Sequence, residues 1–152
     1  PDSSLVSRKL ASTRLVLCAS PAYLKRRGTP LHPSELVDHD VLGYSLLATG
    51  DQWHFEGPQG PVTVKVRPRF VSNNGDSCIA ACVQGAGIQL QPTFLIAEEL
   101  RRGKLVEILP QFKALTLGIY AVYPTRKFVL PKVRALVEFL DARLREAPWA
   151  SL

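Results

Sequence analysis

The segment from Val62 to Ala86 limits the possible fold more than any other part of the sequence. Apolar and polar residues alternate from Val62 to Val71, with the period of two expected for a strand that has one buried and one wet face. The next six residues, SNNGDS at 72–77, are typical of a helix start, and an apolar helical stripe follows them. A strand, a capped turn and a helix in this order leave backbone N–H groups free to bind a ligand.

The predicted strand carries one irregularity. Val62, Val64, Val66 and Phe70 are expected to form its buried face. Pro68 lacks the N–H that a central strand would donate, so the strand is either at a sheet edge or irregular at that point.

Strand-like and helix-like segments alternate along the rest of the chain. The pattern predicts strands at 15–19, 41–45, 52–56, 88–91, 105–109 and 115–123, and helices at 22–27, 33–37, 77–86 and 92–102. Trp53 and Phe55 share one face of their strand and are expected in the core. The continuous apolar run at 115–123 predicts a central strand covered on both faces. This alternation predicts an α/β fold with a largely parallel sheet.

A last helix is predicted from Pro131 to a stop at Pro148. Its apolar stripe consists of Val133, Leu136, Val137, Leu140 and Leu144. Asp141 and Arg145 are spaced to form an ion pair, which is expected on the wet side of this helix.

Composition indicates a soluble protein of one domain or two small lobes. The chain has 152 residues, of which 46% are hydrophobic, and no apolar stretch is long enough to cross a membrane. Residues 1–8 lack the pattern of a signal peptide, and the first residue is proline, which favours a fragment or a processed chain. The net charge is +6, but the basic residues lie in short separated groups without a nucleic-acid motif. We expect them to form a solvated surface and not to contact DNA directly.

The three cysteines, Cys18, Cys78 and Cys82, are too few for a disulfide framework, which suits a reducing cytoplasm. Cys78 and Cys82 are four residues apart, so they lie on one helical face and are expected in the core. A thiol switch stays open as an alternative, because a position near a helix N-terminus stabilises a thiolate.

Metal-binding and catalytic motifs are not found. A cluster between His32 and Asp40, with Glu35, Asp38 and His39, has suitable ligand atoms, but its spacing matches no zinc motif and predicts a polar surface segment. The sequence also lacks a GxSxG motif, a phosphate-binding glycine loop and an organised Ser/His/Asp set. We therefore expect neither a cofactor, nor a metal site, nor enzymatic activity.

Six sequence pieces in order carry a family resemblance. They are LVLCASPAYLKRRGTPLHPSELVDHDVL, a tryptophan between strand pairs, RFVSNNGDSCIAACVQGAGIQLQP, GKLVEILP, GIYAVYP and KVRALVEFLDARL. Together they make the chain similar to the effector-binding domain of LysR-type transcriptional regulators. This resemblance implies a type 2 periplasmic-binding-protein-like fold, in which two crossing strands join two lobes around a ligand cleft. The crossings would fall near 16–20 and 119–123. Residues 19–118 would form lobe II, and residues 1–18 and 119–152 would form an incomplete lobe I.

The resemblance also implies partners. The expected ligand is a small-molecule effector, and the full-length protein would be a cytoplasmic homodimer or tetramer. It would bind DNA only through an N-terminal winged helix-turn-helix, which this sequence does not contain. The alternatives are a solute-binding protein of a transport system and an enzyme on the same fold.

Four residues are predicted to bind the effector. The resemblance places Ser20 at the first crossing and Asn73 and Asn74 at the strand-to-helix turn that faces the cleft. Helix capping by Ser20 and by the two asparagines is the structural alternative. Gln91 departs from the usual small or apolar residue of the family, and its amide either binds a ligand or lies at an exposed edge. The helix dipole favours an anionic effector, whereas Asp76 opposes one, so the charge of the effector stays open.

Overall fold

The computed structural model describes residues 5–124, 130–147 and 149. The first four residues and Pro148, the predicted end of the last helix, lie outside this part. Strands and helices alternate in the order β1 (Leu5–Ala19), α1 (Pro21–Arg27), the 3-10 helix η1 (Pro33–Asp38), β2 (Val41–Tyr44), β3 (Gln52–Gly57), β4 (Gly60–Lys65), β5 (Pro68–Ser72), α2 (Gly75–Val83), β6 (Ile88–Pro92), α3 (Thr93–Arg101), β7 (Val106–Glu107), β8 (Thr116–Pro124) and α4 (Pro131–Arg145). No helix in the described residues is long and apolar enough to span a membrane.

The main sheet is mixed. Its strand order is β5-β2-β6-β1-β7, and β8 pairs with β1. β2 runs parallel to β5 and β6, whereas β1 is antiparallel to β6 and β7. The predicted α/β class is therefore confirmed, but the prediction of a largely parallel sheet holds only for three strands, because the long β1 runs against them.

Packing divides the chain into two compact units. Unit 1 comprises residues 1–13 and 116–152, and unit 2 comprises residues 14–115. The chain thus changes unit at 13/14 and 115/116, compared with the 18/19 and 118/119 boundaries expected for the two lobes.

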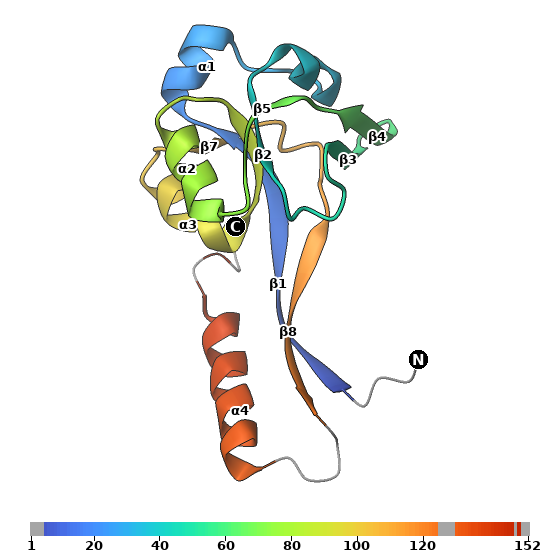
Figure 1. Cartoon of the computed structure of the whole chain (residues 1–152), viewed down its shortest axis with the longest axis vertical. Helices are drawn as coiled ribbons and strands as arrows, with labels where there is room; N and C mark the ends of the chain where they lie inside the picture. The colour runs from blue at the N-terminus through green and yellow to red at the C-terminus, as the bar shows by residue number, and fades with distance from the viewer. Residues whose placement is uncertain (1–4, 125–129, 148, 150–152) are drawn as a thin grey trace. The chain divides into compact units, whose positions relative to one another are not determined.

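The core of unit 2 lies between its sheet and two helices. α2 and α3 pack against each other and against β6 (Figure 1). Between them the structure buries a cluster of seven residues: Val16, Cys18, Leu42, Ile79, Cys82, Ile96 and Leu105. The apolar stripe predicted for the helix after residue 77 supplies its α2 members.

The strand predicted at 62–71 is two strands that belong to different sheets. β4 pairs with β3 in a hairpin, whereas β5 begins at Pro68 and forms the edge of the main sheet beside β2. The prediction of an edge or an irregularity at Pro68 is confirmed. Val64 and Val66 are buried, but Phe70 is 41% exposed because the edge strand β5 has turned away from the hairpin.

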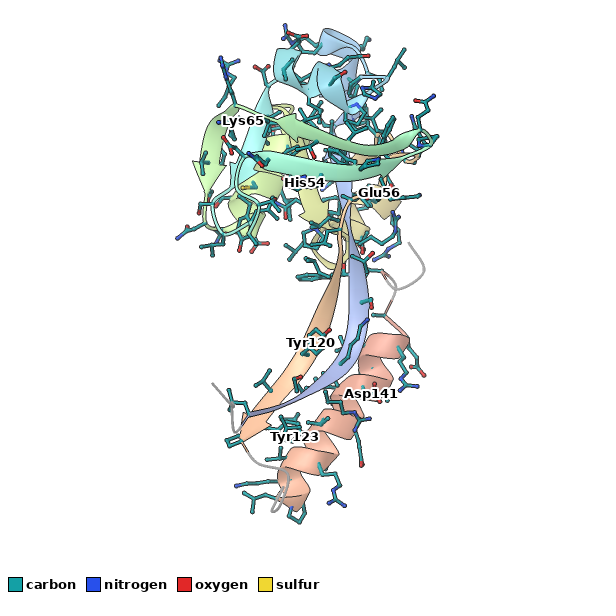
Figure 2. The ribbon with its side chains drawn as sticks, turned by 90° about the vertical axis from the view of Figure 1, so that its right-hand side faces the viewer. His54, Glu56, Lys65, Tyr120, Tyr123 and Asp141 are labelled. Atoms are coloured by element: carbon teal, nitrogen blue, oxygen red, sulfur yellow. The ribbon has the colours of Figure 1, made fainter. Side chains whose placement is uncertain are left out.

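The β3–β4 hairpin has one buried and one wet face. Trp53 and Phe55 are buried as predicted, while His54 and Glu56 alternate with them on the outer face (Figure 2). Opposite His54, the Thr63 hydroxyl lies 2.8 Å from the imidazole Nδ1.

In unit 1, β8 is not the doubly covered central strand that its sequence predicts. Within the described residues it pairs only with β1, and Tyr120 and Val122 are more than half exposed. Figure 2 shows Tyr120 and Tyr123 on this strand. The strand is apolar, as its sequence shows. Among the described elements, however, none covers the face that carries the exposed side chains.

In α4, the predictions for Leu136 and for Asp141 are both wrong. Its buried side includes Val137 and Asp141, whereas Leu136 is 56% exposed. Asp141 does pair with Arg145, but not on the wet side: its carboxylate turns toward β1 and accepts a 2.8 Å hydrogen bond from Arg8. These ion pairs hold the pKa of Asp141 below its ordinary value. The side of α4 that faces β1 thus carries a charged residue, Asp141, because Arg8 of β1 compensates its charge.

Truncation of Leu136 is consequently expected to be mild. Leu136→Ala should lower the free energy of unfolding by less than about 0.5 kcal/mol, because most of the side chain is already in water. Val137→Ala, one residue further and 7% exposed, should cost about 1–2 kcal/mol although it removes fewer carbon atoms. Urea denaturation of both variants measures the difference, and a larger loss for Leu136 would contradict the observed orientation of α4.

Candidate functional site

The carboxyl ends of three parallel strands in unit 2 define the candidate site. The register places Tyr44 of β2 beside Ser72 of β5, and Gln91 on β6 lies two residues beyond Gln89, which pairs with Leu42 of β2. The chain continues from β5 into α2 through Asn73 and Asn74, both exposed. Ligands of open α/β sheets commonly bind at this edge, outside the carboxyl ends of the strands.

Asn74 prepares the start of α2. It is the N-cap residue, and its Oδ1 accepts a 3.0 Å hydrogen bond from the backbone N–H of Ser77. The N–H of Asn74 donates in turn to the Ser72 hydroxyl at 3.0 Å. The N–H groups of Gly75 and Asp76 precede the first intrahelical bond, so the helix itself supplies them with no acceptor. The capping predicted for this turn is thus present, and it leaves two backbone donors at an exposed edge.

Gln91 lies inside the sheet, not at an exposed edge. β6 is flanked by β2 and β1, and Gln91 is 2% exposed opposite Val16. It shares a face with Gln89, as the sequence predicts. Gln91 therefore does not lie at an exposed edge of the sheet. It is a buried amide two residues before the start of α3.

Two further polar residues lie near the site, Ser72 before the helix cap and Gln89 on β6. Ser72 positions Asn74 through its hydroxyl, as expected of a serine before a helix cap. Gln89 is fully buried opposite Cys18, and a hydrogen bond from its amide acts on the Cys18 thiol, whose pKa it lowers against the larger opposing effects of Cys82 and burial.

Ser20 does not lie with the other three predicted residues. Cys18 pairs with Gln89, so Ser20 is located beyond the amino end of β6, about 13 Å along the strands from the level of Gln91. It is 2% exposed and caps α1, accepting a hydrogen bond from the Tyr23 N–H at 3.3 Å. Asn73, Asn74 and Gln91 thus lie toward the same end of the parallel strands, with β2 between β5 and β6, whereas Ser20 lies toward the other end and caps α1.

The three cysteines are buried thiols. A hydrogen bond with the Cys82 side chain, together with burial, raises the pKa of the Cys18 thiol well above its ordinary value. Burial also raises the pKa of Cys78, which outweighs the stabilisation expected near a helix start. Cys78 and Cys82 are therefore packed in the core, as mainly predicted. Burial there disfavours the thiolate that a thiol switch would need.

The polar residues between His32 and Asp40 point to separate partners. His32 accepts from the Ser34 N–H, and Glu35 accepts from the Leu31 N–H. Asp40 instead binds Arg69. In the part of the chain that the structure describes, no group of three potential metal ligands converges.

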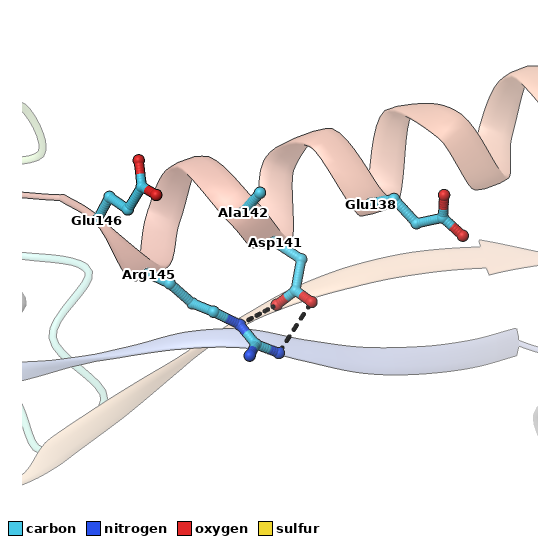
Figure 3. A pocket seen from close by; sticks show the side chains of 5 residues that line it. All are labelled: Glu138, Asp141, Ala142, Arg145 and Glu146. Carbon is cyan, nitrogen blue, oxygen red and sulfur yellow. Dashed lines mark hydrogen bonds and ion pairs between the residues drawn. The ribbon is translucent and has the colours of Figure 1, made fainter.

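Unit 1 has a shallow pocket of about 390 Å³ on α4, lined by Glu138, Asp141, Ala142, Arg145 and Glu146 (Figure 3). Its central carboxylate, Asp141, already binds Arg8 and Arg145. The charge of Asp141 is thus compensated from both sides, and the remaining charged groups of the lining, Glu138 and Glu146, are acidic. Such a lining does not suit an anionic ligand, so the carboxyl edge of unit 2 is the better candidate.

These features define a class of protein: a mixed α/β, periplasmic-binding-protein-like domain with polar groups at the carboxyl end of its parallel strands. The sequence model described as LysR substrate binding domain matches residues 1–145. The chain belongs to this family, which is one of transcriptional regulators.

Relatives and solved structures agree with this assignment. The chain is 35% identical over 148 residues to the HTH-type transcriptional regulator PtxR of Pseudomonas aeruginosa, covering 97% of this chain and 47% of that protein. It is similar to the regulatory domain of CrgA from Neisseria meningitidis, with a TM-score of 0.83 and 33% identity over 94% of this chain and 71% of that domain. Full-length AphB, a Vibrio cholerae virulence activator, matches with a TM-score of 0.81 and 33% identity, covering 93% of this chain and 49% of AphB. The chain thus spans about half the length of the full-length relatives it matches.

Proposed function

We propose that the chain is the effector-sensing domain of a LysR-type transcriptional regulator. A small metabolite binds it, favours one arrangement of the domain and thereby changes DNA binding by a helix-turn-helix domain in the same full-length protein. A homodimer or tetramer is the proposed assembled form. No element described here is proposed to bind DNA.

The observation that carries this proposal is the start of α2. Two backbone N–H groups without a helix partner, those of Gly75 and Asp76, follow the exposed Asn73 and Asn74 after the carboxyl end of β5. Donors gathered in this way suit a ligand with carboxylate or carbonyl oxygens. Asp76 is exposed in the first turn, so the site is not uniformly positive and a neutral polar ligand also fits it.

The alternative of a transport solute-binding protein has less support. Such proteins share the architecture, but the relatives with closely similar sequence are named transcriptional regulators. No arrangement of nucleophile, base and oxyanion donors at the site favours an enzyme among the described residues.

Removing the Asn74 amide is expected to weaken effector binding about tenfold, because a ligand would lose one hydrogen bond and part of the helix start. The experiment uses the full-length regulator. A thermal-shift screen with small aliphatic and aromatic carboxylates, amino acids and inorganic phosphate identifies a ligand. Calorimetric titration of that ligand then compares Asn74→Ala and Asn73→Ala with the wild type.

Two variants control for stability. Asn74→Ser keeps a capping hydroxyl and removes only the amide, so it separates ligand contact from helix capping. Ser20→Ala removes a cap at the far end of the sheet and is expected to lower Tm without changing affinity. Unchanged affinity in both asparagine variants would move the effector site away from this turn.

A further inference from the structure

Tyr23 joins three segments at the amino end of the parallel strands in unit 2. It is fully buried on α1, and its Oη accepts a hydrogen bond from the Asp40 backbone N–H at 2.9 Å. The same oxygen lies 3.0 Å from Nδ1 of His39. Tyr23 therefore links α1 to the two residues that lead from η1 into β2.

This geometry suits a neutral His39. A backbone N–H can only donate, so the Tyr23 oxygen is the acceptor toward Asp40 and its hydroxyl hydrogen is left for another partner. The hydroxyl hydrogen can be donated to His39 Nδ1, which lies 3.0 Å away, when this nitrogen carries a free lone pair. In that arrangement the imidazole is neutral, with its hydrogen on Nε2.

Asp40 ties this linkage to the sheet. Its carbonyl accepts from the Ile88 N–H of β6 at 2.8 Å. Its carboxylate binds Arg69 of β5 at 2.6 Å and lies 3.9 Å from Arg27 of α1. A movement of the Asp40 backbone would thus disturb contacts with α1, β5 and β6 at the same time.

Charges around His39 come from two elements. Arg27 of α1 faces it and disfavours the imidazolium, whereas Glu35 and Asp38 of η1, together with Asp40, favour it. Burial and Arg27 prevail, so the pKa of His39 is lower than its ordinary value. Protonation would replace the Nδ1 lone pair with an N–H, and the Tyr23 hydrogen would lose its acceptor.

We propose that Tyr23, His39 and Asp40 form a proton-sensitive latch, which is closed when His39 is neutral and opens when His39 is protonated. Opening releases α1 and η1 from the amino end of the sheet. A latch of this kind makes the domain sensitive to acidification independently of any effector.

The pH dependence has a defined sign. Because the folded state binds the proton less tightly than the unfolded state, the latch contributes its full stability above the unfolded pKa of about 6.5. This stability is lost as the pH falls from that value toward the lower folded pKa. A His39→Gln variant cannot titrate and should lack this component.

Thermal melts of the 152-residue chain at about pH 7.5 and about pH 5.5 test the latch. Between these conditions, the Tm of the wild type should fall by about 3 °C more than that of His39→Gln. Tyr23→Phe, which lacks the hydroxyl, should reduce the pH dependence in the same way. His54→Gln, an exposed histidine on the hairpin, should retain the wild-type dependence.

The 15N chemical shifts of the His39 ring, measured by NMR, give a second test. A histidine with only a structural role would not show the changes expected here. The His39 Nδ1 signal at neutral pH should be that of an acceptor, and it should change on titration together with the Tyr23 resonances. Equal pH dependence in wild type and His39→Gln, or a His39 hydrogen located on Nδ1 at neutral pH, would overturn the latch.

Discussion

Replacing Gly87 with alanine is expected to lower the free energy of unfolding by about 3 kcal/mol, because the added carbon meets backbone atoms that cannot move aside. A Cβ at Gly87 would lie 2.3 Å from the carbonyl oxygen of Asp40 and 2.9 Å from its carbonyl carbon. That carbonyl is held by the Ile88 N–H at 2.8 Å, where β2 and β6 pair. The clash is therefore relieved only by separating two strands of the sheet.

Urea denaturation of Gly87→Ala measures this loss. Gly103→Ala is the matched control, because a Cβ there meets nothing within 4 Å and the cost comes only from its φ of 67°. We expect about 1 kcal/mol for that variant. If Gly87→Ala proves no less stable than Gly103→Ala, the close approach of Gly87 to Asp40 is wrong.

Replacing Leu36 with alanine should cost about 2–5 kcal/mol. Leu36 is completely buried on η1, which packs against β4 of the hairpin. Truncation removes three carbon atoms from this contact and leaves a cavity, since the short 3-10 helix has little freedom to close it. The same denaturation experiment gives the value.

Leu31 supplies an internal comparison. It is the same residue type five positions earlier and is 77% exposed, so Leu31→Ala should change stability by less than about 0.5 kcal/mol. Similar losses in the two variants would show that η1 does not pack on the hairpin as described.

The sequence predicted local structure well because local structure depends on short-range signals. Asn74 before an apolar stripe, Pro21 and Pro33 at helix starts and Gly28 after α1 each act within one turn of backbone. The alternation of strands and helices then sufficed for the α/β class, and Trp53 and Phe55 were correctly expected in the core.

Side-chain environment was predicted less well where a partner comes from far along the chain. Phe70 follows the same alternation as Val64 and Val66, but β5 leaves the hairpin and pairs with β2 instead. Asp141 belongs on a wet face by its charge, yet Arg8, 133 residues away, compensates it beside β1. The periodicity of a sequence shows which residues share one face of a strand or helix. It does not show which other segment packs against that face.

The candidate site shows the same division. The sequence by itself determined the capped start of α2, since Ser72, Asn74 and Ser77 interact over a few residues. Only the tertiary structure decided which distant residues accompany it. Strand register brings Gln91 to this edge and, because β1 is antiparallel to β6, carries Ser20 to the other end. Direction and register of strands arise from pairing between remote segments, and local sequence does not encode them.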